Sequence, residues 1–242
     1  MRSTLFAATL LLTMLAGNAA DRKYAVLSLV GDRFLVTGRS GVVNRPAREF
    51  VALPEPLIDA TALAAVKEGL ASAQPAASAT LLLAREPALY AAAEAILDAG
   101  LGAGALYEAI EPALRVGDAD LIVLVSKARE QARLRFHNVY FETDGRIEGV
   151  GFYVDSAKRV ARLTDGQVSH GFLGVFAYIR ISLIDPASRK VLAEELLLGS
   201  TTARDPDKTP WDSMSAEAKV RTLKALVHDE IVRAMPRLLR GR

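Results

Sequence analysis

The stretch AYIRISLIDPASRKVLAEELLLGS (residues 177–200) is the most regular pattern in the chain, and it predicts two β-strands joined by a polar turn. Alternate apolar residues from Ile179 to Leu183 point one way, and the residues between them point the other way. This alternation predicts a strand with one packed face and one solvated face. Asp185 and Pro186 suit the first two positions of a type I turn. We therefore expect a late β-hairpin.

Upstream of this hairpin, strands alternate with helices. YAVLSLV (24–30), ATLLLA (79–84) and ADLIVLVS (119–126) are apolar runs, and the last two are suited to strands covered on both faces. DATALAAVKEGL (59–70) predicts a helix that Asp59 caps, and Pro87 opens a second helix. The order strand, helix, strand, helix, strand indicates right-handed crossovers in a largely parallel sheet.

Three further features complete the predicted architecture. Gly31-Asp32 resembles a two-residue hairpin turn, and residues 38–56 lack periodicity, which predicts a long surface loop. Residues 127–170 suggest a β-hairpin insertion that turns at Asp144-Gly145. The chain ends in an amphipathic helix, with Thr209 as the expected cap.

These patterns place the chain in the α/β class, as a single domain over residues 21–242. We expect a three-layer or two-layer sandwich with a mixed, mostly parallel sheet, late β-hairpins and a C-terminal amphipathic helix.

Residues 1–20 form an expected signal peptide: Arg2 precedes a short apolar run, and small residues allow cleavage near Ala19 or Ala20. The apolar run is shorter than the ~20 residues that a membrane span needs. The chain has no cysteine, which excludes disulfides, thiol nucleophiles and thiolate metal sites. We therefore expect a periplasmic or secreted protein with no transmembrane insertion.

Charge gives no case for a nucleic-acid partner. The chain has 30 Lys and Arg against 28 Asp and Glu. Removing residues 1–20 takes away one basic residue, which leaves 29 against 28, a net charge of +1. A nucleic-acid-binding domain is expected to carry a strong basic excess.

No motif for nucleotide, zinc or calcium binding is found in the sequence, and we predict no metal site and no cofactor. Asp118 and Asp120 bracket the start of a predicted buried strand, and His170 lies near a turn. Such residues can act as acids, bases or ligands for a divalent ion. They are equally compatible with ordinary turn and loop positions, so they are weak catalytic candidates.

A basic cluster follows the buried strand 119–126 directly, in the order Lys127, Arg129, Arg133 and Arg135. The open end of a parallel sheet is where α/β proteins present ligands. Arginine guanidinium groups there could form bidentate hydrogen bonds with carboxylates or phosphates of an envelope polymer, or with acidic groups on a protein. A solvated connector is the alternative interpretation.

The segments 119–126, 179–185, 190–192 and 220–238 together resemble a periplasmic α/β domain. This domain occurs in the curli secretion channel subunit, in lipoprotein activators of penicillin-binding proteins and at the N-terminus of TolB. The chain departs from that pattern in two places: Ser188-Arg189 replaces the usual Thr-Gly of the turn, and the lipid-anchoring Cys is absent. The resemblance implies a non-enzymatic domain that docks onto envelope proteins.

The sequence thus suggests an exported, non-enzymatic envelope protein that binds a protein or an anionic envelope polymer through loops and the basic patch. An exported hydrolase or a small-ligand-binding protein is the alternative. The hydrolase would use Asp118, Asp120 or His170 and requires these side chains to converge in one cleft. The small-ligand-binding protein requires a pocket with convergent polar groups.

Overall fold

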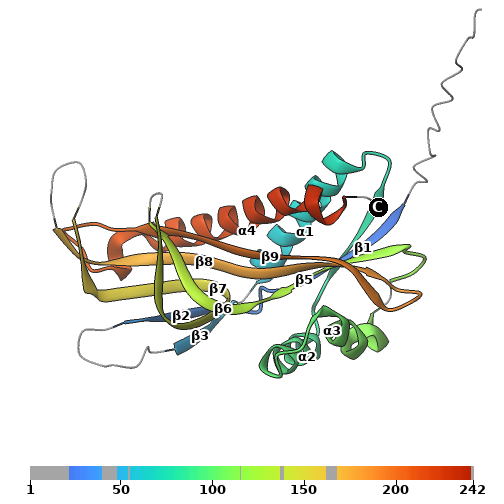
Figure 1. Ribbon diagram of the computed structural model, residues 1–242, viewed down its shortest axis with the longest axis horizontal. Coiled ribbons are helices and arrows are strands. Elements are labelled where there is room, and N and C mark those ends of the chain that lie inside the picture. The colour runs from blue at the N-terminus through green and yellow to red at the C-terminus, as the bar shows by residue number, and fades with distance from the viewer. Residues whose placement is uncertain are drawn as a thin grey trace, which may run out of the picture.

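The computed structural model describes residues 22–39, 48–53, 55–114, 116–136, 139–161 and 168–240. The expected signal peptide, residues 1–20, lies outside the described residues. Within them the chain has an elongated shape, with long paired strands along its length (Figure 1). Among the helices described, none is both long enough and apolar enough to cross a membrane.

One mixed sheet runs through the molecule in the order β3-β2-β7-β8-β5-β1-β4, with β9 paired to β8 and β6 paired to β7. The strands are β1 (Lys23–Leu29), β2 (Arg33–Arg39), β3 (Arg48–Ala52), β4 (Ser78–Leu83), β5 (Leu121–Lys127), β6 (Arg129–Phe136), β7 (Val139–Ala161), β8 (Val168–Asp185) and β9 (Lys190–Ala203). The helices are α1 (Leu57–Ala73), α2 (Pro87–Asp98), α3 (Ala103–Ile110) and α4 (Ala216–Leu238), with short 3₁₀ turns at Glu111–Ala113 and Trp211–Ser213.

The α/β class, the mixed sheet, the late hairpin and the C-terminal helix are confirmed. The predicted crossovers are also present, because β4, β1 and β5 lie side by side and parallel. The sheet contains fewer parallel strand pairs than predicted, since β2–β7 is the only other parallel pair among the described strands. The β8–β9 hairpin and its neighbours make the sheet more antiparallel than the early rhythm suggested.

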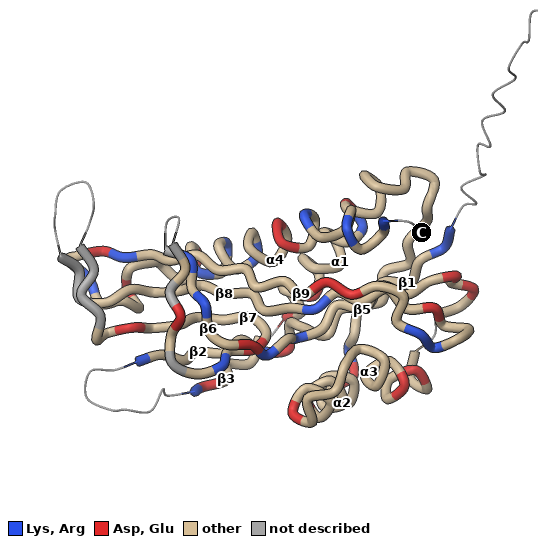
Figure 2. The backbone as a smooth tube through the Cα atoms, in the orientation of Figure 1, with Lys and Arg blue, Asp and Glu red and all other residues tan. Residues whose placement is uncertain are grey.

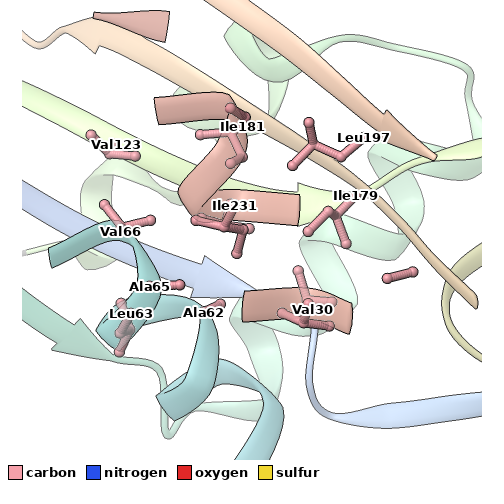
Figure 3. Close-up of a cluster of buried hydrophobic side chains, with 14 of the residues drawn as sticks. Val30, Ala62, Leu63, Ala65, Val66, Val123, Ile179, Ile181, Leu197 and Ile231 are labelled. Atoms are coloured by element: carbon pink, nitrogen blue, oxygen red, sulfur yellow. The ribbon is translucent and has the colours of Figure 1, made fainter. Parts of the chain in front are cut away.

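Helices α1 and α4 cover one face of the sheet (Figure 1). Figure 3 shows the core between them, where Ile231 of α4 and Val66 of α1 meet Ile181 of β8. Each of these side chains is fully buried, and burying such a residue contributes about 1.5–3 kcal/mol. Apolar packing on this face therefore holds the two helices to the sheet.

The opposite face is covered in two parts. Helices α2 and α3 pack on β1 and β5 at one end, through residues such as Leu106 and Ile122. Further along, β6 and the first part of β7 fold over β8 and enclose Phe176 and Tyr178. The prediction of a solvated face on β8 was wrong at two of its three residues: Tyr178 is buried beneath β6 and β7 and Ser182 is also buried, while Arg180 is partly exposed.

Two turn predictions were wrong. Gly31-Asp32 makes no hairpin: β1 pairs with β4 and β5, whereas β2 pairs with β3 and β7. Asp144-Gly145 lies inside β7, at an irregularity where the β6–β7 register shifts, and makes no hairpin turn. Both pairs of residues carry a local turn signal that long-range strand pairing overrides.

The remaining corrections concern element boundaries. The predicted loop 38–56 contains the end of β2 and all of β3, and residues 40–47 lie outside the description. Ser215 caps α4 through Ala218 N, while Thr209 hydrogen-bonds Asp212 in the preceding turn. The strand at 79–84 is also not covered on both faces, because β4 has exposed or partly exposed residues at every position on both of its faces.

Candidate functional site

A cleft of about 950 Å³ opens at the carboxyl ends of β1 and β4. Residues 31–33 and 83–85, which follow these two strands, form its floor. One wall is the face of α2 that carries Tyr90, Glu94 and Asp98, and the other is the connection from β3 to α1. In open α/β sheets this end of the strands is where ligands bind.

Asp59 joins the elements that build the cleft. Its side chain is fully buried, and Oδ1 accepts hydrogen bonds from Ser28 Oγ (2.5 Å), Val30 N (2.9 Å) and Gly31 N (3.1 Å). Tyr90 Oη of α2 donates to Oδ2 at 2.7 Å. Burial raises the pKa of the Asp59 carboxyl above its usual value, although the four hydrogen bonds favour the ionised form. One carboxyl therefore ties the end of β1 to α1 and α2.

The structure gives Asp59 a different role from the predicted one. Helix α1 begins at Leu57, and its cap position is Pro56, which makes no side-chain hydrogen bond. Gly31 is needed for the same arrangement, since a Cβ there would lie 2.7 Å from Asp59 N. Burial also raises the pKa of the Tyr90 hydroxyl, with the Asp59 carboxylate as the second cause, so this hydroxyl stays protonated as a donor.

Two ion-pair groups fix α2 against the sheet beside the cleft. Glu94 lies 2.7 Å from Arg33 Nη2 and 3.6 Å from Lys127 Nζ, which also lies 2.6 Å from Asp32 Oδ1. The Lys127 side chain is only 8% exposed, so these contacts are shielded from water more than a surface pair is.

The second ion-pair group centres on Glu148 of β7, whose side chain is 2% exposed. Arg129 Nε donates to Glu148 Oε2, and Arg48 Nη2 lies 3.2 Å from the same oxygen. Arg129 Nη2 also reaches Asp98 Oδ1 of α2 at 2.6 Å. Both guanidinium groups thus neutralise the buried Glu148 carboxylate, and Arg129 also pairs with the exposed Asp98.

The predicted basic cluster therefore divides into two parts. Lys127 and Arg129 lie beside the cleft, at the end of the sheet where the sequence placed them, and are ion-paired. Arg133 and Arg135 lie on the exposed side of β6, and Arg133 pairs with Glu142 at 3.3 Å. Figure 2 shows basic and acidic residues interspersed along the chain in this region, not gathered into one basic face.

The weak catalytic candidates lie at different ends of the sheet. Lys23 Nζ contacts Asp118, and Lys23 N donates to Asp120 Oδ2 at 2.9 Å. The hydrogen bond from Lys23 Nζ to Asp118 and the positive charge of Lys23 lower the pKa of the exposed Asp118 carboxyl. The two aspartates thus anchor the start of β1 beside the start of β5, at the end opposite to the cleft.

His170 lies on β8, where its backbone is in register with Arg159. On the same strand Ile184 pairs with Ile122, next to Asp120. Residues 170 and 184 are fourteen positions apart, which is roughly 46 Å along a strand at ~3.3 Å per residue. The convergence that the hydrolase hypothesis required of these three residues is therefore not met.

Two exposed charges at the cleft belong to no ion pair with another described residue: Arg85, just after β4, and Glu55, just before α1. Apolar lining from Leu53, Leu83 and Ala91 lies between the charged groups. A ligand with an apolar part and charges of both signs would match this lining. Glu55 lies within the predicted surface loop 38–56, but sequence patterns singled out neither residue, because only the fold brings positions 55 and 85 to one cleft.

No family model matches the chain. A search of curated proteins found no match either.

Solved structures give distant likenesses. A Xanthomonas campestris protein of the DUF330 family has a TM-score of 0.39 and 7% identity, over 90% of this chain and 83% of that one. The hypothetical protein CT253 of Chlamydia trachomatis has a TM-score of 0.32 and 12% identity, over 91% and 99%. A Helicobacter pylori protein described as a neuraminyllactose-binding hemagglutinin homolog has a TM-score of 0.34 and 8% identity, over 91% and 84%.

Proposed function

We propose that this chain is an exported, non-enzymatic protein of the cell envelope that binds a partner protein, and that the cleft beside α2 is its recognition site. The observation that carries the proposal is the pair of unpaired, opposite charges, Arg85 and Glu55, at a cleft with apolar lining. Recognition sites combine an apolar surface with a few polar groups that fix orientation in this way.

The charges favour a polypeptide over an anionic polymer. Among the lining residues, Asp32, Glu55, Glu94 and Asp98 are acidic, whereas only Arg33 and Arg85 are basic. A polyanion would meet more like charge than opposite charge at this lining. A polypeptide segment, with acidic, basic and apolar side chains together, offers groups for both Arg85 and Glu55.

Export is supported by the pattern of residues 1–20 and by the position of the first strand. β1 begins at Lys23, directly after the expected cleavage at Ala19 or Ala20. The full chain should be expressed in a Gram-negative host, the cells fractionated and the N-terminus of the recovered protein sequenced. We expect a periplasmic product that begins at residue 20 or 21. Recovery of an uncleaved chain in the cytoplasm would contradict export.

Binding can be tested with a display library of linear 12-residue peptides, selected against the exported protein. We expect an enriched peptide whose affinity, measured by fluorescence anisotropy, falls about tenfold in Arg85→Glu, which corresponds to about 1.4 kcal/mol. Lys67→Glu, an exposed charge reversal on α1 away from the cleft lining, is the matched control and should change affinity less than twofold. Failure to enrich any peptide, or equal affinity of Arg85→Glu and the wild type, would refute the cleft as the recognition site. A polyanion that competes with the peptide would also argue against the assignment.

A further inference from the structure

The edge strand β4 carries none of the features that usually protect an exposed sheet edge. Among the described strands it pairs only with β1, so its other side presents unpaired backbone N–H and C=O groups. Its sequence, SATLLL, has no charge and no proline. Natural proteins protect exposed edges with charged residues, proline or bulges, because an unprotected edge pairs with other chains.

The other edges of the sheet are protected. β3 carries Arg48 and Glu49, and β9 carries Glu194 and Glu195 and lies against α4. β4 instead exposes Leu81 (39%) and Leu83 (38%), which are two positions apart and therefore lie on the same face of the strand, the face toward α1. The apolar side chains and the free backbone edge thus coincide on one strand.

This edge leads into the cleft. Leu83 is the last residue of β4, and residues 83–85 form part of the cleft floor. A segment that lies along β4 would therefore continue to the unpaired charges, Arg85 and Glu55. Only an extended polypeptide backbone can satisfy alternating N–H and C=O groups along a strand edge.

We propose that the partner's segment binds as an additional β-strand on the free edge of β4 and continues into the cleft. This inference rests on the proposed function and names the mode of binding. Alternate side chains of the segment contact Leu81 and Leu83, while its main chain hydrogen-bonds to β4.

A second copy of this chain fits the edge less well. In an antiparallel β4–β4 pair, the start of one β4 would lie beside the end of the other. The chain leaves α1 at Ala73 and enters β4 at Ser78, so only residues 74–77 separate the two elements. The second copy would place the end of its own α1 near the cleft, and it would offer no extended segment that could enter the cleft. A separate polypeptide has no such constraint.

The test uses the library-selected peptide and a set of its analogues, each N-methylated at one residue. Strand addition predicts that N-methylation at every second position lowers affinity at least tenfold, while the intervening positions change it less than threefold. This scan leaves the protein unaltered, so misfolding cannot produce the pattern.

Leu81→Lys should lower peptide affinity at least tenfold. Leu196→Lys, at a leucine of similar exposure (42%) on β9, which pairs with β8, should lower it less than twofold. Equal urea midpoints of the two variants would exclude unfolding as the cause.

If peptide affinity depends on Arg85 but shows neither the alternating effect of N-methylation nor an effect of Leu81→Lys, strand addition is refuted. The assignment of the cleft as the recognition site would then stand. No dependence on Arg85 would refute the proposed function itself. Because the chain has no cysteine, Leu81→Cys gives a single thiol. A wild-type dimer that Leu81→Lys dissociates and Leu81→Cys cross-links would show that a second copy occupies the edge, which would overturn the proposal.

Discussion

Replacement of Asp59 tests whether one carboxyl organises the cleft. In Asp59→Ala, four donors lose their acceptor. The two hydroxyls can rotate to other acceptors, and Tyr90 Oη already lies 3.4 Å from Ala84 O. The backbone N–H groups of Val30 and Gly31 cannot turn, because β1 and its connection to β2 hold them in place.

The expected loss follows from these two N–H groups. A buried donor left without an acceptor costs about 1–3 kcal/mol, so two give about 2–6 kcal/mol. Domains are stable by only about 5–15 kcal/mol, so the middle of this range, about 4 kcal/mol, is a large fraction of the total. Asp59→Asn keeps one acceptor oxygen for the N–H groups and should lose less, about 1–2 kcal/mol.

Urea unfolding followed by circular dichroism at pH 7 measures both losses, and a pH series tests the cause. The folded-state pKa of Asp59 is raised, so the native state binds more protons than the unfolded state between the two pKa values. The part of the stability that depends on protonation of Asp59 is fully present below the unfolded pKa of about 3.9 and is lost as the pH rises through the folded pKa. The advantage of wild type over Asp59→Asn should therefore decrease as the pH rises from 4. A loss below 1 kcal/mol for Asp59→Ala, or an advantage over Asp59→Asn that grows with pH, would refute the reasoning.

Three further changes test the packing, a helix bridge and the late turn. Gly69→Ala would place a Cβ 2.4 Å from Met235 Cγ of α4, so we expect the free energy of unfolding in urea to fall by about 1–3 kcal/mol. The same change at an exposed helical position would raise it by about 1 kcal/mol, so a gain in stability would contradict this packing. The His228 ring contacts two carboxylates, one on α1 and one on α4, and these raise its pKa. Its advantage over His228→Gln should be present below pH 6.5 and lost as the pH rises through the folded pKa, amounting to less than about 1 kcal/mol at this partly exposed site; a pH-independent difference would contradict it. Arg189 has a φ of 57° and pairs with Glu111, so Arg189→Gly should be more stable than Arg189→Ala, which loses the same ion pair, by up to about 1 kcal/mol in urea unfolding. Equal stability of the two variants would count against strain in the turn.

The late hairpin was predictable because its signals are local. Asp185 and Pro186 start the turn, Asp185 Oδ1 accepts from Ala187 N at 2.9 Å, and the strands pair directly on either side. The departure at Ser188-Arg189 also has a structural counterpart, since Arg189 adopts the left-handed backbone that glycine would take without strain. Local sequence determined both the position and the geometry of this turn.

The early segments were harder to predict because distant partners decide their roles. Gly31 carries a turn signal, but its small size serves the approach of Asp59. An aspartate in the first turn of a helix gives the same pattern whether it caps the helix or binds a neighbouring strand. Likewise, the apolar run of β4 suggests a strand covered on both faces, although both faces are at least partly exposed and no other described strand pairs with its outer edge.

The basic cluster shows how a correct position can accompany a different role. Lys127 and Arg129 lie at the open end of the parallel strands, as predicted, and there they attract Glu94 and Asp98 of α2. Paired in this way, they fix the wall of the cleft and leave little charge for a ligand. Binding sites are effective when their walls are rigid before the ligand arrives. Recognition then depends on charges that the fold leaves unpaired, so Arg85 should control affinity more strongly than any residue of the predicted basic patch.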